Sequence, residues 1–259
     1  MTPIKFRTVW FVTDGELPTT AKGIADLVSV AKAGKFDAVQ FQHFAWAGAT
    51  AADIRNVATA LRAIGTKANP FGLGAHVRVD LWEDSMARLL RAMVPDLIYA
   101  DGLEAVDEPN ARNRTRALRD AFTPTVIEGT DTNYETDTAT AALWKGVFTR
   151  FGTTDQFSDG ESFWYQYDDQ FDKLLRAPGY RAKLWGAYER VIAWCRTRIP
   201  DGKTDGRLMT PDEGAWLMLS RRMLAAEMGR DVAITLQLSL ADAVTPAGQK
   251  LLAAIGGAS

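Results

Sequence analysis

Short runs of β-forming residues alternate with longer runs of helical periodicity along almost the whole chain, and this alternation restricts the possible folds most strongly. Strands are expected at residues 6–13, 36–42, 71–79, 102–106, 124–128, 206–210 and 232–240, with a sixth at 156–158 or 162–167. Helical runs separate them, and the later ones cover residues 139–151, 180–198, 214–228 and 246–255. A regular strand–helix alternation predicts parallel strands joined by right-handed crossovers.

Helix start and stop signals support this division. Thr19 or Thr20 can cap a helix that ends at Gly34, and Thr50 can cap the next one, which Gly65 closes. Eight strand–helix pairs in steps of about 30 residues predict an α/β protein made of one (β/α)8 TIM barrel spanning residues 1–259. The main alternative is an open doubly wound sheet. Residues 13–18 follow the first strand without the glycine-rich phosphate turn of that fold.

Composition excludes several classes of function. Hydrophobic residues make up 47% of the chain, which is enough for a full core, and the formal net charge is −2 without any basic block. Nucleic acid is therefore not an expected partner. Cys195 is the only cysteine, so no internal disulfide or cysteine-based zinc cluster can form, and we expect a buried filler rather than a catalytic thiol.

Targeting signals are also missing from the sequence. The N-terminus lacks signal-peptide architecture, and no apolar run approaches the ~20 residues of a membrane span. We expect a protein that is cytoplasmic at synthesis and has no membrane partner, while association with a virion or release by lysis stays open. Nothing in the residues indicates an oligomeric state.

Polar and aromatic side chains collect where the expected strands end. A barrel places its chemistry at the carboxyl ends of its strands. Glu108 and Glu213 each follow such a strand, and paired carboxylates at one rim are the apparatus of glycosidic bond cleavage. Glu128 ends the fifth strand. The candidate substrate-binding residues at the other strand ends are Gln42, His43, Trp46, His76, Arg78, Asp107, Asn110, Asp131, Trp164 and Trp216.

Both histidines and several tryptophans belong to this set, and each type allows more than one interpretation. His43 and His76 can bind a sugar hydroxyl, tune a carboxylate or serve the structure alone. They could also hold a metal, but no His-x-His or His-Glu-x-x-His spacing occurs, and we expect neither a metal nor another cofactor. A tryptophan after a strand can stack on a sugar ring or simply pack over the barrel.

Two motifs resemble those of the retaining glycoside hydrolases with (β/α)8 barrels. Residues 106–110, Val-Asp-Glu-Pro-Asn, are similar to the Asn-Glu-Pro motif after strand four of that clan. Residues 210–214, Thr-Pro-Asp-Glu-Gly, are similar to the setting of the clan's nucleophile after strand seven. The resemblance implies that Glu108 is the acid/base and Glu213 the nucleophile. Asp107 stands where the clan has the asparagine that holds the sugar 2-hydroxyl.

The sequence thus predicts a glycoside hydrolase-like enzyme that cleaves a poly- or oligosaccharide with two carboxylates. One alternative is a non-catalytic carbohydrate-binding or structural barrel, for example as part of a phage particle. Another is a metal-assisted hydrolase or lyase that uses His43 and His76.

Overall fold

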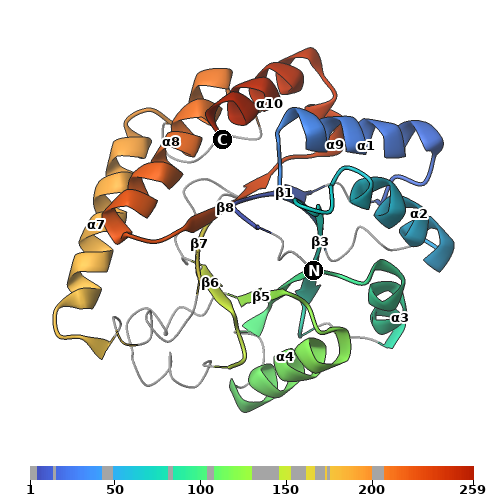
Figure 1. Cartoon of the computed structure of the whole chain (residues 1–259), viewed down its shortest axis with the longest axis horizontal. Coiled ribbons are helices and arrows are strands. Elements are labelled where there is room, and N and C mark those ends of the chain that lie inside the picture. The colour runs from blue at the N-terminus through green and yellow to red at the C-terminus, as the bar shows by residue number, and fades with distance from the viewer. Residues whose placement is uncertain are drawn as a thin grey trace.

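The computed structural model of the chain is a curled sheet surrounded by helices (Figure 1). It describes residues 5–13, 16–42, 49–80, 84–103, 108–129, 146–152, 162–166, 173, 176–199 and 207–259. The strands are β1 (Thr8–Val12), β2 (Ala38–Phe41), β3 (Gly72–Arg78), β4 (Leu97–Asp101), β5 (Val126–Gly129), β6 (Arg150–Gly152), β7 (Ser162–Gln166) and β8 (Val232–Gln237). The helices are α1 (Ala21–Ala33), α2 (Ala51–Arg62), α3 (Asp84–Met93), α4 (Glu108–Phe122), α7 (Tyr180–Arg196), α8 (Pro211–Met228), α9 (Leu240–Ala243) and α10 (Pro246–Ala258).

Six strands in the order β8-β1-β2-β3-β4-β5 form a parallel sheet that curls into a half-barrel. The short strand β6 extends it in parallel from β5, whereas β7 is antiparallel to both β6 and β8, and through these two strands the pairing returns to β8. The α/β class is therefore confirmed. The expected barrel of eight parallel strand–helix units is wrong, because β7 runs in the opposite direction to its neighbours.

Three expected elements also differ from the structure. The fourth strand lies at Leu97–Asp101 rather than 102–106, because Gly102 adopts a positive φ of 70° and ends the strand before that segment. Residues 146–147 form a turn, Phe148 lies in an isolated β-bridge and residues 150–152 form β6, where the end of a helix was expected. Residues 207–210, the described part of the expected seventh strand, contain no strand. The glycoside hydrolase resemblance needed a strand there and is overturned.

Threonine caps explain where several helices begin. The side chains of Thr20, Thr50 and Thr210 accept hydrogen bonds from backbone amides in the first turns of α1, α2 and α8, as helix N-caps do. In α2 and α8 the third residue returns a bond to the cap, which completes a capping box. The starts of α1, α2 and α8 are therefore set by local sequence.

The sheet separates two apolar regions. Its outer face and the surrounding helices form the main core, which contains Trp10, Leu73, Ile98 and the buried Cys195. A second, small apolar cluster lies on the inner face near the amino ends of the parallel strands, and its members are Phe6, Val9, Ala38, Leu97 and Val126. This cluster forms a floor inside the half-barrel. The opposite end, where the parallel strands finish, is called the mouth below.

Candidate active site

Register places a layer of polar side chains directly above the floor. His76, Tyr99, Glu128 and Arg150 are consecutive partners across β3, β4, β5 and β6, and partners in register point to the same face of a sheet. Leu97 belongs to the floor and Tyr99 lies two residues beyond it, so this face is the inner one. The inside of the half-barrel therefore changes from apolar at the floor to polar toward the mouth.

Five side chains, called the polar layer, carry buried atoms without a hydrogen-bond partner among the described residues. The layer consists of Gln40, His76, Glu128, Arg150 and Thr235. The atoms are Gln40 Nε2, His76 Nδ1, both carboxylate oxygens of Glu128, Arg150 Nη2 and Thr235 Oγ1. Buried polar atoms cost stability when they lack a partner. Five such side chains on one inner surface call for an explanation, and they make this surface the candidate site.

Glu128 and Arg150 face each other in the middle of this layer. Their Oε2 and Nε atoms are 3.4 Å apart, and both side chains are almost fully buried. Burial raises the pKa of Glu128 to about 7, against the attraction of the Arg150 charge, which lowers it. Arg150 also donates from Nη1 to the carbonyl of Phe6 at 3.1 Å. Glu128 can therefore gain and lose a proton near neutral pH, as a general acid or base must.

His76 and Asp101 form a second pair, closer to the mouth. His76 Nε2 is 2.9 Å from Asp101 Oδ2, and its ring stacks on Tyr99 at 5.1 Å and meets the edge of Phe11 at 5.4 Å. Burial alone would raise the pKa of Asp101, but His76, the Gly102 amide and the Arg78 charge outweigh burial and lower this pKa. Asp101 is therefore ionised where Glu128 is still partly protonated.

Arg78 and Asp80 support this pair from the end of β3. Arg78 donates to Asp80 with Nε at 2.9 Å and with Nη2 at 2.7 Å, and its Nε is 3.9 Å from Asp101 Oδ2. These bonds to Arg78 lower the pKa of Asp80. A Cβ atom on Gly102 would lie 2.1 Å from Asp80 Oδ1, so glycine at this position permits the close approach.

The structure brings together only part of the predicted site. His76 and Arg78 both lie next to Asp101 near the mouth. Gln42 follows β2, is half-buried, and donates its backbone N–H to the Val12 carbonyl at 3.4 Å. Asn110 is exposed on α4, while Trp216 lies half-buried on α8 against the main core.

Other predicted residues are only partly described. Glu108 is the first residue of α4 and Trp164 belongs to β7, but their side chains are not described. His43, Trp46, Asp107 and Asp131 lie outside the described residues. The assignments made for these six residues stay predictions.

The Glu213 carboxylate accepts hydrogen bonds from the start of its own helix and from Arg207. Glu213 is the third residue of α8, its Oε2 accepts the Thr210 amide at 2.7 Å, and Arg207 donates to both carboxylate oxygens at 2.8 and 2.7 Å. The hydrogen bonds from Arg207 are the main reason why the pKa of Glu213 is lowered. The segment that resembled a nucleophile motif is the capping box of a helix.

Sequence reasoning missed two of the central residues. Asp101 was overlooked because the fourth strand was placed five residues too late, although a carboxylate directly after Leu97–Ala100 and before a glycine is itself a strand-end signal. Arg150 was assigned to a helix. A strand of three residues carries too little periodicity to be recognised.

Comparisons with known proteins do not assign the chain to a family. No protein-family model matches it, and no curated protein matches it either. Within the described ranges, no group of three His, Cys, Asp or Glu side chains could hold a metal ion. None of the described helices is long and apolar enough to span a membrane.

Proposed function

We propose that the protein hydrolyses glycosidic bonds, with Glu128 as the proton donor and Asp101 as the ionised carboxylate. One observation carries the proposal: two carboxylates lie on the inner face of adjacent parallel strands, and their pKa values are shifted in opposite directions. Environments that separate two carboxyl pKa values in this way are characteristic of acid–base pairs in catalysis.

The strand register supports cooperation between the two groups. Tyr99 is the partner of Glu128, and Asp101 follows Tyr99 by two residues, so Asp101 faces the same side one step nearer the mouth. Standard strand spacings separate such a diagonal pair of Cα atoms by about 8 Å. The two side chains thus start from neighbouring positions on one inner face, which is the arrangement that a pair of catalytic carboxyl groups needs.

Other side chains of the inner face suit an uncharged, hydroxylated substrate. Gln40 and Thr235 offer buried polar atoms without a charge, and Tyr99, whose ring stacks on His76, adds an aromatic group. Neutral hydrogen-bonding groups and aromatic rings are the groups that line sugar-binding sites. The basic groups nearest the mouth, His76 and Arg78, already contact acidic side chains.

The proposed reaction uses the two carboxyl groups in sequence. Glu128, in its protonated form, gives its proton to the leaving glycosidic oxygen while the bond to the anomeric carbon breaks. Asp101, held by His76, either attacks the anomeric carbon or removes a proton from the attacking water. The anomer of the first product distinguishes these two routes, since a covalent intermediate retains the configuration and direct water attack inverts it.

The test is hydrolysis of an oligosaccharide panel by the wild type and by Glu128→Gln and Asp101→Asn. Both substitutions should reduce kcat by about 10²-fold or more. Asp212→Asn, at an exposed position of α8, is the matched control and should retain full activity. Full activity of either site variant would refute the assignment. A wild type that binds oligosaccharides without turnover would instead support the non-catalytic carbohydrate-binding alternative.

A further inference from the structure

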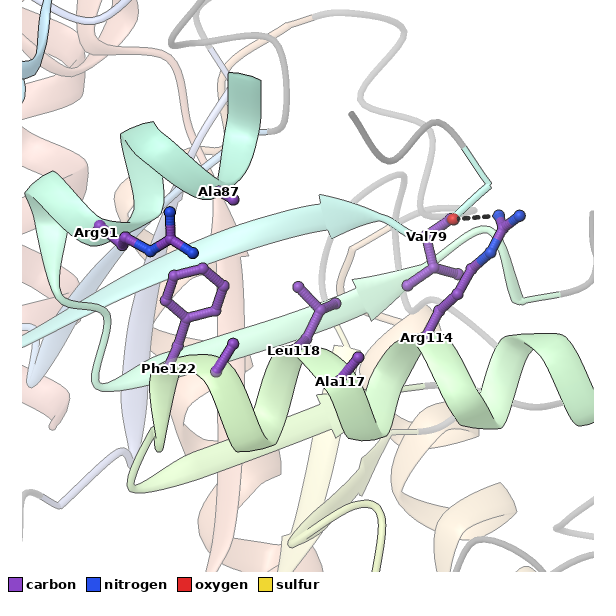
Figure 2. Close-up of a pocket in the computed structure, with 8 residues that line it drawn as sticks. Val79, Ala87, Arg91, Arg114, Ala117, Leu118 and Phe122 are labelled. Atoms are coloured by element: carbon purple, nitrogen blue, oxygen red, sulfur yellow. Dashed lines mark hydrogen bonds between the residues drawn. The ribbon is translucent and has the colours of Figure 1, made fainter. Parts of the chain in front are cut away.

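A pocket of about 200 Å³ lies between α3 and α4, on the outer side of the sheet and away from the polar layer (Figure 2). We call it the α3–α4 pocket. Val79, Leu118 and Phe122 line it with buried apolar side chains. A dry apolar cavity of about 150 Å³ is large enough for benzene. The α3–α4 pocket therefore has room for a single ring with a short substituent.

The remaining lining residues make the pocket open and positively charged. Ala87, Ala117 and Ala121 have short side chains, and the latter two are exposed on α4, so a ligand can enter from solvent. The two polar side chains that line it are both cations, Arg91 and Arg114. All eight described lining residues are thus apolar or basic, which favours an anion with an apolar body.

The two arginines differ in the hydrogen bonds that they form with described residues. Arg114 donates from Nη1 to the carbonyl of Val79 at 2.7 Å, which fixes it at one end of the pocket. Arg91 forms no hydrogen bond or ion pair with any described residue, and Figure 2 shows it on α3, with Phe122 on α4 lining the same pocket. A guanidinium can bind a carboxylate through two parallel hydrogen bonds.

We infer that the α3–α4 pocket binds a small aryl carboxylate, with the ring against Leu118 and Phe122 and the carboxylate on Arg91. This site is separate from the polar layer and does not depend on the proposed hydrolysis. The apolar lining supplies the contact area for the ring, while Arg91 supplies the charge that selects an acid over a neutral analogue.

The experiment is a ¹⁹F NMR titration of the full chain with 4-fluorophenylacetate, and with the neutral 4-fluorophenylacetamide as the paired probe. We expect a dissociation constant for the acid below about 1 mM, as ligand efficiencies of small ligands allow. The amide should bind at least about tenfold more weakly.

Three variants locate the site. Arg91→Gln should weaken binding of the acid about tenfold and leave the amide unchanged. Ala121→Phe, on the exposed side of α4, should block both probes by filling the space. Arg88→Gln, on α3 but outside the pocket lining, is the matched control and should bind like the wild type. The inference is overturned if the acid does not bind, or if it binds equally well to Arg91→Gln and Ala121→Phe. Hydrolytic activity enters none of these readouts.

Discussion

At the scale of single residues, burial and charge shift the pKa values of two neighbouring carboxyl groups in opposite directions. Burial raises the pKa of Glu128, and the charge of Arg150 offsets only part of this effect. Burial also acts on Asp101, but the hydrogen bond and the charge of His76 outweigh it and lower the pKa. A carboxyl group on β5, that of Glu128, therefore exchanges its proton near neutral pH, whereas the carboxyl group of Asp101 on β4 stays ionised there. Both effects can be measured by titration.

The rate of hydrolysis should depend on pH as a bell-shaped curve. The alkaline limb should follow loss of the Glu128 proton at a pKa of about 7. The acidic limb should follow Asp101, at a pKa below the usual aspartate value. The measurement is kcat/KM across the pH range for the wild type and for Glu128→Gln, whose residual activity should lack the alkaline limb. An unchanged alkaline limb in that variant would assign it to another group.

Protein stability should also depend on the protonation of Glu128. Its pKa is higher in the folded state than the ordinary 4.5, so the folded state binds the proton more tightly. The free energy of unfolding should fall as the pH rises from about 4.5 to about 7, by up to about 3 kcal/mol, and level off above that.

Urea unfolding at a series of pH values measures how the free energy of unfolding changes with pH. In Glu128→Gln this free energy should no longer change with pH over the range. The substitution also leaves Arg150 without its carboxylate, which lowers the stability by the same amount at every pH. Glu189→Gln, at an exposed position of α7, provides the comparison and should keep the wild-type slope. A wild type whose stability does not change over this range would show that Glu128 titrates normally.

At the scale of secondary-structure elements, α8 depends on its first turn. Glu213 closes the capping box with Thr210 and holds Arg207 through two hydrogen bonds. Glu213→Ala removes the bond to the Thr210 amide and both bonds from Arg207, but the backbone amide of residue 213 still donates to the Thr210 hydroxyl. It should lower the free energy of unfolding by about 1–3 kcal/mol, the range for removing the charged partner of hydrogen-bond donors.

Chemical denaturation checks that value, and hydrolysis per folded molecule should stay at the wild-type level. Asp53→Ala breaks the corresponding capping box of α2, at an exposed site, and should have a smaller effect. A complete loss of activity in folded Glu213→Ala would restore a catalytic interpretation of this glutamate.

Element boundaries were predictable where a local signal defines them. The sequence indicated Thr50 as one cap and the pair Thr19-Thr20 as another, and the structure confirms Thr50 and selects Thr20, because a side-chain cap needs only its own first turn. The fourth strand was misplaced, since Leu97–Asp101 and residues 102–106 are both short apolar runs. Only the positive φ at Gly102 separates them, and a sequence does not show which glycine adopts one.

At the scale of the whole molecule, the strand–helix rhythm predicted the α/β class and parallel strands, but it predicted a full (β/α)8 barrel where the structure has six parallel strands in a half-barrel. Residues 162–167 were one of two candidates for the sixth strand, and β7 lies there. Its antiparallel direction was not predicted, because the alternation of side chains along a strand is the same in both directions. The polar layer was predicted only in part for a related reason. His76 and Glu128 are visible as strand-end residues, but their pairing with Asp101 and Arg150 depends on register between strands.

Hydrogen exchange should reveal the unequal strength of the sheet. Four register pairs join β1 to β2 and four join β2 to β3, whereas β6 is three residues long and shares only two register pairs with β5. Mass spectrometry of deuterated peptides should therefore show faster exchange in β6 than in β1–β3. Equal protection of β6 and β1–β3 would mean that β6 opens only with the whole fold.

The reversal of β7 has a consequence for how this scaffold can diversify. Strand β6 finishes, and β7 starts, at the same end of the sheet where Asp101 lies, because the two strands form an antiparallel pair. A peptide grafted between Gly152 and Ser162 would extend the chain at the end of the sheet where Asp101 lies, without interrupting the β6–β7 ladder. Libraries randomised in length and composition at this junction would therefore vary the surroundings of the proposed site while the sheet keeps its pairing.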